Sequence, residues 1–204
     1  MLWTRRFKVI LFVLLLVPFV VHLTMLFQGK IIDPVEELTG ESGEWALRCL
    51  MLTLAVTPLR QLTGLGSLTI LRRMLGLFAF FYASCHFVVY IWLDQYFAWA
   101  DIVEDILKRR YIFAGFLGFV LMIPLAMTSF NRAIRWLGSK RWQALHRLVY
   151  VCGIAAVVHY FWLVKSDYTE PFVYGAILAV LLAARIWQSQ KRKRRRRKPK
   201  TVTG

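Results

Sequence analysis

Residues 145–164 form an apolar run with a histidine near each end, LHRLVYVCGIAAVVHYFWLV. A helix of about 20 apolar residues is long enough to span the hydrocarbon core of a bilayer. His146 and His159 would then both lie within the membrane, where an ionisable side chain marks a candidate functional site. This run therefore predicts a membrane-spanning helix that carries two site residues.

Five further apolar runs lie along the chain. The predicted spans are about 7–27, 45–62, 75–93, 111–128, 145–164 and 172–187. The first run lacks a small-residue cleavage site, so we interpret it as a membrane anchor and not as a signal peptide. The 204 residues are 58% hydrophobic, above the roughly 45–50% of soluble domains. The sequence predicts an all-α integral membrane protein, with a bundle of six transmembrane helices over residues 1–190 and a basic tail at 191–204.

The charged residues predict how this bundle is oriented. Lys and Arg in short loops stay on the cytoplasmic side, and the chain has 27 of them against 11 Asp and Glu. With the N-terminus inside, most of the basic residues fall on the cytoplasmic side, and every acidic residue falls on the opposite side. We therefore predict an N-in, C-in topology with an acidic outer face.

The predicted tail begins with a strongly basic run. Residues 191–200 are all Lys or Arg except Pro199. Directly after a membrane span, such a run is expected to bind anionic lipid headgroups. An acidic soluble partner is the alternative, and a nucleic-acid partner is not expected.

The four histidines all lie in or at the end of apolar runs. The third span runs outward from Arg72, and His86 lies 14 residues further on, about 21 Å along a helix axis. The fifth span runs outward from His146, and His159 follows after 13 residues, about 19.5 Å along. His86 and His159 should therefore lie at one outer depth, and His146 and Arg72 at one inner depth. His22 has no matching histidine and is predicted to be structural or interfacial.

Two neutral imidazoles that face each other from different helices are suited to a six-coordinate b-type haem. We predict that His86 and His159 are the axial ligands of an outer haem, because an interior of Phe, Trp, Leu and Val favours a large apolar macrocycle over a small hydrated ion. A spacing of 13 residues turns a straight helix by about 140° from its starting face. His146 must therefore face another neighbour, unless Gly153 permits a bend.

An inner haem on His146 would need a second ligand that the sequence does not reveal. Arg72 is predicted at the same depth, where a guanidinium suits the propionate of a haem or the phosphate of a flavin. The alternative for Arg72 is a cytoplasmic charge that only sets topology.

Several motifs resemble the MsrQ (formerly YedZ) family, the haem-binding membrane subunits of bacterial periplasmic methionine sulfoxide reductase systems. These motifs are Trp142 with Leu145-His146, Val149-Tyr150 and His159-Tyr160-x-Trp162, together with Thr57-Pro58-Leu59, Arg72-Arg73-Met-Leu-Gly76-Leu and His86. The chain is more distantly similar to the membrane domain of ferric reductases and NADPH oxidases.

The resemblance implies a six-helix protein of the bacterial inner membrane that carries one or two b-type haems and FMN. It implies that electrons pass outward to MsrP, a periplasmic molybdopterin enzyme that reduces methionine sulfoxide in oxidised proteins. The haem-binding histidines of the family correspond to His86, His146 and His159. Ferric reductases and NADPH oxidases usually carry a second histidine in the third span, where this chain has Arg72.

The sequence does not identify the electron donor or the docking surface for the acceptor protein. After six spans no residues are left for a nicotinamide-binding domain, so quinol or a cytoplasmic flavin reductase is the expected donor. The acidic segments Asp33–Glu44 and Asp94–Asp105 are expected to dock MsrP through complementary charge, although topology alone would explain their acidity. The alternatives are a quinol-oxidising cytochrome b that anchors another periplasmic reductase, and a proton-coupled transporter, which would favour carboxylates within its spans.

Overall fold

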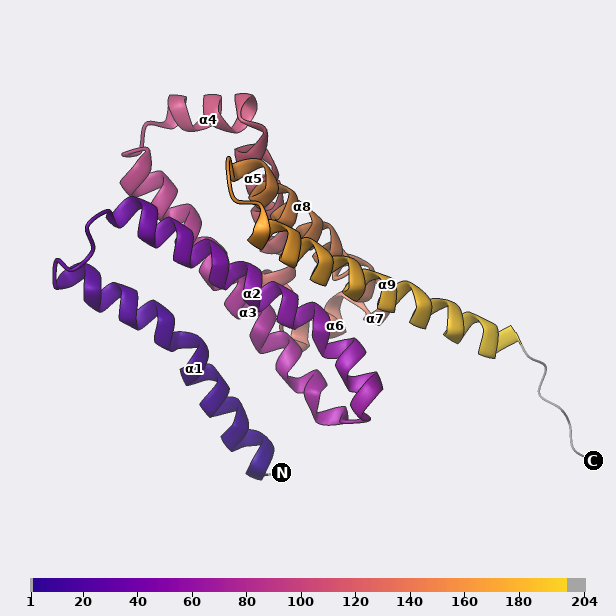
Figure 1. Ribbon diagram of the computed structural model, residues 1–204. Helices are drawn as coiled ribbons and strands as arrows, with labels where there is room; N and C mark the ends of the chain where they lie inside the picture. The colour runs from indigo at the N-terminus through magenta and orange to yellow at the C-terminus, as the bar shows by residue number, and fades with distance from the viewer. Residues whose placement is uncertain (1, 198–204) are drawn as a thin grey trace, which may run out of the picture.

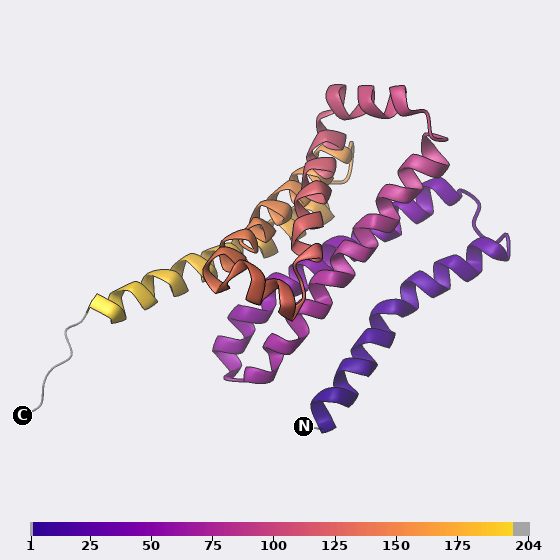
Figure 2. The ribbon, with the colours of Figure 1, turned by 180° about the vertical axis from the view of Figure 1, so that it is seen from behind.

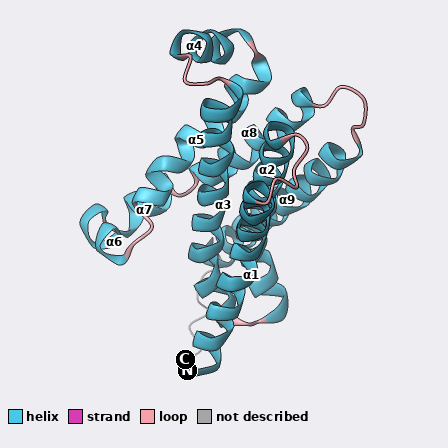
Figure 3. Ribbon diagram, turned by 90° about the vertical axis from the view of Figure 1, so that its left-hand side faces the viewer, coloured by secondary structure: helices cyan, strands magenta, loops and turns pink. Residues whose placement is uncertain are grey.

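A computed structural model of the chain describes the backbone of residues 2–197 and the side chains of residues 6–191. This part of the chain is helical and contains no strand (Figure 3). The helices are α1 (Leu2–Phe27), α2 (Pro34–Thr63), α3 (Thr69–Val89), α4 (Trp99–Lys108), α5 (Arg110–Met127), α6 (Asn131–Leu137), α7 (Ser139–Leu145), α8 (Leu148–Leu163) and α9 (Thr169–Arg197). A 3-10 turn at Gly66–Leu68 precedes α3, and a π-helical turn at Tyr90–Asp94 follows it. The predicted all-α class is confirmed.

Five helical segments of the described chain are long and apolar enough to span a membrane. They are Arg6–Phe27, Gly66–Asp94, Arg110–Met127, Ser139–Leu163 and Thr169–Lys191. Each contains most or all of one predicted span. The remaining predicted span, residues 45–62, lies in α2, which carries Arg48 and Arg60 and is not among the five. The protein is a multi-pass membrane protein.

The central helices pack as two antiparallel pairs, α2 with α3 and α5 with α8. Figure 1 places the N-terminus and the α2–α3 turn at one end of the molecule, and α4 with the α1–α2 connection at the other, which we call the α4 end. α1 lies along one side of the bundle (Figure 2), and α6 and α7 form a short arm at its side (Figure 3). Successive long helices therefore run in alternating directions through the bundle.

Local sequence signals explain where α2 begins and ends. Asp33 is the N-cap, and its side chain accepts hydrogen bonds from the N–H groups of Val35 and Glu36, each at 3.0 Å. Pro34 occupies the first helical position, where its missing N–H costs nothing. Gly64 ends the helix at φ 72°, a left-handed conformation that favours glycine. This turn returns the chain into α3 alongside α2.

The core lies between α2, α3 and α8, with a contribution from α1. Cys49 and Cys152 are almost completely buried in this core, and both are free thiols. The Tyr82 hydroxyl of α3 donates a 2.6 Å hydrogen bond to the Leu15 carbonyl of α1. This contact lies one turn before Pro18, which interrupts the hydrogen bonding inside α1. The first helix is thus tied to the bundle at its middle.

The predicted helical bundle ends at residue 190, whereas the last helix, α9, continues to Arg197. The ammonium group of Lys191 lies 5.1 Å from the centre of the Trp187 ring. The predicted lipid contacts of the basic tail involve side chains that, Lys191 apart, lie outside the described residues.

Candidate functional site

His86 on α3 and His159 on α8 meet inside the bundle. Their ring centroids are 6.1 Å apart, and the ring planes cross at 84°. Both rings line a cavity of about 380 Å³ bounded by α2, α3, α5 and α8, which we call the histidine-pair cavity. It lies at the α4 end, because Ile106 and Arg109 also line it. The structure therefore brings together the two histidines that helical rise places at one depth.

A backbone carbonyl holds each of these two rings. His86 Nδ1 lies 2.9 Å from the carbonyl oxygen of Thr39 on α2, and His159 Nδ1 lies 2.6 Å from that of Tyr111 on α5. A carbonyl oxygen only accepts hydrogen bonds, so each Nδ1 carries the proton and donates it. Each Nε2 then keeps its lone pair, which is the state required of a metal ligand. The same bond fixes the direction in which the ring points.

A glycine lies against each ring. A Cβ added to Gly43 on α2 would lie 3.1 Å from His86 Nδ1, and one added to Gly115 on α5 would lie 2.8 Å from His159 Nδ1. Contacts this short are closer than carbon and nitrogen atoms normally approach without displacement. The two glycines therefore allow the imidazoles to lie directly on the neighbouring helix backbones.

The residues of this cavity fit a haem better than a bare metal ion. Among the described residues, no group of three or more His, Cys, Asp or Glu side chains could hold an ion. A structural zinc site requires about four protein ligands, whereas a porphyrin supplies four nitrogens and leaves two axial positions. The walls are mostly apolar, with Leu47, Leu50, Phe87, Phe116, Phe119 and Met122 among them.

His146 belongs to a second cavity of about 270 Å³, which we call the His146 cavity. The helix is interrupted here: α7 ends at Leu145 and α8 begins at Leu148. The His146 ring stacks on Trp142 with a centroid distance of 3.9 Å and an angle of 25° between the planes. α8 continues through Gly153 without interruption. His146 and His159 therefore line different cavities, and the break at His146 takes the place of the bend considered at Gly153.

The His146 cavity carries basic side chains in a mostly apolar lining. Both ring nitrogens of His146 are buried and have no hydrogen-bond partner among the described residues. Arg72 and Arg73 line the same cavity, and the Arg73 guanidinium donates a 2.7 Å hydrogen bond to the Asn131 side chain. In the described part of the chain, no carboxylate forms an ion pair with either arginine. The cavity is thus suited to an anionic group, which two guanidinium groups would bind.

Comparison with known proteins identifies the family. The family described as ferric reductase like transmembrane component matches residues 42–157, which is more than half of the chain. The protein-methionine-sulfoxide reductase heme-binding subunit MsrQ of Xanthomonas campestris pv. campestris strain 8004 is 53% identical over 156 residues, 76% of this chain and 71% of that protein. The chain belongs to the MsrQ family. The resemblance seen in its motifs is thereby confirmed.

Other MsrQ proteins match over similar or greater lengths. The protein of Herminiimonas arsenicoxydans is 49% identical over 163 residues, covering 78% of this chain and 75% of its own. That of Ralstonia nicotianae is 46% identical over 186 residues, covering 90% and 86%. Both are named heme-binding subunits of protein-methionine-sulfoxide reductase. No solved structure matches the chain.

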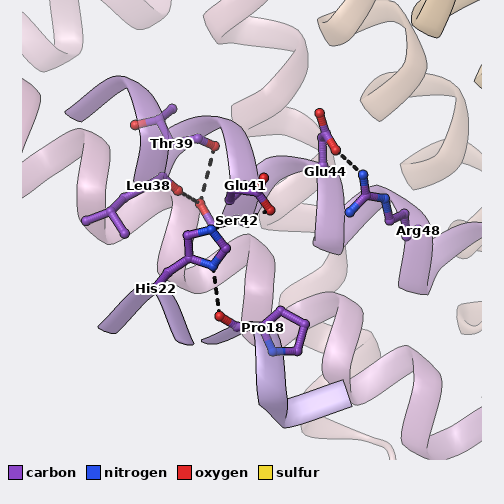
Figure 4. A network of polar contacts seen from close by, with 8 residues as sticks. All are labelled: Pro18, His22, Leu38, Thr39, Glu41, Ser42, Glu44 and Arg48. Carbon is purple, nitrogen blue, oxygen red and sulfur yellow. Dashed lines mark hydrogen bonds and ion pairs between the residues drawn. The ribbon is translucent and has the colours of Figure 1, made fainter. Parts of the chain in front are cut away.

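In this MsrQ family member, His22 lies outside the linings of both cavities. Its Nδ1 is 2.8 Å from the Pro18 carbonyl oxygen of its own helix, and its Nε2 is 3.8 Å from a carboxylate oxygen of Glu41 on α2 (Figure 4). On the same part of α2, the Ser42 hydroxyl donates to the Leu38 carbonyl. His22 therefore contributes to the contact between α1 and α2.

Two kinds of site feature in this MsrQ chain were missed by sequence reasoning. Backbone carbonyls such as those of Thr39 and Tyr111 have no sequence signal. The role of Gly115 also has no sequence signal, because the space beside it is occupied by the His159 ring, whereas Gly118 on the same helix packs against α8, where an added Cβ would lie 3.5 Å from the Ala155 Cβ.

Proposed function

We propose that this chain is a membrane electron-transfer subunit that binds a b-type haem between His86 and His159. The arrangement of the two rings carries the proposal: each Nδ1 donates to a carbonyl, and each Nε2 is left as a ligand within one cavity. The naming of the MsrQ relatives as heme-binding subunits supports it. A haem held in this way takes up and passes on one electron at a time.

The protein contributes ligand orientation and a dry environment. The hydrogen bonds to the Thr39 and Tyr111 carbonyls hold each imidazole in one orientation and increase the basicity of its Nε2. Phe87, Phe116 and Phe119 line the same cavity and exclude water from it. Since solvent access and local polarity set the potential of a haem, these walls would determine the driving force of transfer.

We infer that electrons leave at the α4 end. In this proposal α2 also crosses the membrane and brings the number of spans to six. Both termini then lie on the cytoplasmic side of the bacterial inner membrane. The acceptor is an MsrP-like periplasmic molybdopterin reductase, so that the chain supports repair of oxidised methionine in periplasmic proteins. The acidic segments Asp33–Glu44 and Asp94–Asp105 flank the α4 end and would steer this partner. The chain is then one subunit of an oxidoreductase complex and not a complete enzyme.

We propose that a second cofactor, bound in the His146 cavity, receives electrons from the cytoplasmic side. A flat ring with an anionic group fits its residues, either a second b-type haem or FMN. The His146 and Trp142 rings provide an aromatic wall, and Arg72 with Arg73 would bind a propionate or a phosphate. The donor is quinol from the membrane or a cytoplasmic flavin reductase.

Visible spectroscopy of the purified full chain tests the proposal. The reduced-minus-oxidised spectrum should be that of a b-type haem with two histidine ligands, and extraction should give the haem and flavin content per chain. His86→Ala and His159→Ala should each remove the haem of the histidine-pair cavity. His22→Ala is the matched control, because His22 lines neither cavity, and it should leave the spectrum unchanged. A colourless wild-type protein, after expression with ample haem, would refute electron transfer and favour a transporter.

A further inference from the structure

A single basic side chain lines the histidine-pair cavity among the residues that the structure describes. This residue is Arg109, which lies between the end of α4 and the start of α5. It precedes Tyr111, whose carbonyl holds His159, by two residues. Arg109 is therefore placed at the edge of the cavity at the α4 end, close to one of the proposed ligands.

Neighbouring side chains orient the Arg109 guanidinium. Its Nε lies 3.0 Å from a carboxylate oxygen of Asp105 on α4, and one terminal nitrogen, Nη1, donates to the Tyr111 hydroxyl at 3.3 Å. The hydrogen bond from Arg109 to Tyr111 and the charge of Asp105 raise the pKa of Arg109, so the group stays charged. The Asp105 side chain is 15% exposed and that of Arg109 is 54% exposed. The guanidinium thus pairs with a half-buried carboxylate at the water-facing rim, and among the described residues Nη2 has no hydrogen bond of its own.

Two hydroxyl groups of the cavity also lack a partner. The Tyr90 hydroxyl and the Thr39 Oγ1 are buried, and neither meets normal hydrogen-bond geometry with a partner among the described residues, although the Asp105 carboxylate is a neighbour of the Tyr90 hydroxyl. Both residues line the histidine-pair cavity. Buried hydroxyls are normally satisfied in folded proteins, so an unpaired one that lines a cavity points to a polar group of a ligand. Tyr90 lies four residues beyond His86, about 6 Å further along the helix axis toward the α4 end.

The chemistry of a b-type haem matches this distribution of polar groups. The macrocycle is apolar apart from two propionate carboxylates on one edge. The cavity is mostly apolar, and Arg109 and Tyr90 are among its few polar side chains. We propose that Arg109 and Tyr90 bind these propionates and so hold that edge of the haem toward the α4 end. The inference rests on the proposed function, because it concerns the haem assigned to His86 and His159.

Acidic side chains also lie at this rim. Two carboxylates, Glu44 and Asp94, also line the cavity. The Glu44 carboxylate is paired with Arg48 on the next turn of α2, so it is already neutralised. Arg109 is the only Lys or Arg of the lining among the described residues. Its Nε pairs with Asp105, so Nη2 is the cationic donor left for a haem carboxylate, and the haem edge that it would hold faces the α4 end.

Binding of haem and of its dimethyl ester to the full-length apoprotein tests the proposal. The ester keeps the iron and the ring but removes both negative charges. Wild type should bind haem about tenfold or more tightly than the ester, as expected for hydrogen bonds to a charged group. Arg109→Gln should abolish most of this preference, and Tyr90→Phe, which removes a single oxygen atom, should reduce it. Arg110→Gln is the matched control, because Arg110 is adjacent but does not line the cavity.

The midpoint potential of the bound haem provides a second readout. Arg109→Gln should lower it, because a positive charge near the iron favours the reduced state, and Arg110→Gln should change it less. Equal binding of haem and ester by wild type, or an unchanged preference in both Arg109→Gln and Tyr90→Phe, would overturn the propionate assignment while leaving the histidine ligands intact. A wild-type chain that binds neither compound would refute the proposed function itself.

Discussion

The two cavities of this MsrQ family member hold their histidine rings through different contacts. In the histidine-pair cavity, a backbone carbonyl bonds to Nδ1 of each ring, and a glycine gives the ring room against the neighbouring helix. In the His146 cavity, neither ring nitrogen has a hydrogen-bond partner in the described part of the chain, and the ring is held by stacking on Trp142. Two guanidinium groups line the second cavity and one lines the rim of the first.

This difference separates two ways of binding a cofactor. The paired histidines are oriented before any ligand arrives, so the iron would meet two ligands already in position. The His146 cavity offers one imidazole and positive charge, so its occupant would be held largely through an anionic group. A substitution that disturbs ring orientation should therefore damage the first site, and one that removes positive charge should damage the second.

The largest effect is expected from Gly115→Ala. The added methyl group would lie 2.8 Å from His159 Nδ1, so the ring must move away from the Tyr111 carbonyl. We expect haem affinity to fall by roughly 10- to 100-fold, as for loss of other groups that orient a metal ligand. Haem titration of purified apoprotein measures this effect.

Gly118→Ala on the same helix is the control for this prediction. Gly118 also lines the histidine-pair cavity, but its added methyl group would meet the Ala155 Cβ at 3.5 Å, an ordinary van der Waals contact, and not a histidine ring. Haem affinity should stay close to that of wild type. Equal losses in the two variants would show that helix packing, and not the position of the His159 ring, is responsible.

An intermediate effect is expected from Arg72→Gln, which removes a positive charge from the His146 cavity. The content of the second cofactor, haem or flavin, should fall about tenfold, since hydrogen bonds to charged groups are worth about 1.5–3 kcal/mol. The spectrum of the haem between His86 and His159 should not change. Arg60→Gln is the control, because Arg60 is exposed and outside this cavity. A change in the first haem alone would contradict the division into two sites.

The smallest effect is expected from Trp142→Phe. Phenylalanine keeps an aromatic ring beside His146 but loses the 2.9 Å hydrogen bond from the indole N–H to the Thr128 carbonyl. The free energy of unfolding should fall by about 1 kcal/mol, as measured by thermal unfolding in detergent. Trp162→Phe, at an exposed position, should be nearly neutral. A shifted spectrum of the His86–His159 haem in Trp142→Phe would show that the two cavities are coupled.

Helical periodicity and hydropathy were sufficient to predict the all-α class and the common depth of His86 and His159 from the sequence. An apolar run long enough for a bilayer has few alternatives to a helix, because every backbone polar group must be satisfied internally. The fixed rise of 1.5 Å per residue then places His86 and His159 at one depth from their spacing to Arg72 and His146 alone. The MsrQ resemblance likewise follows from short motifs that need no coordinates.

Tertiary structure decided the features that depend on contacts between distant segments. The carbonyls of Thr39 and Tyr111 lie 47 and 48 residues from the histidines they hold, and every residue has a carbonyl, so no pattern identifies these two. The break at His146 arises where the chain turns from α7 into α8, whereas periodicity assumes a straight helix. Helix rise determines depth along an axis, but only packing determines which neighbour a side chain meets and which atoms remain free to bind a ligand.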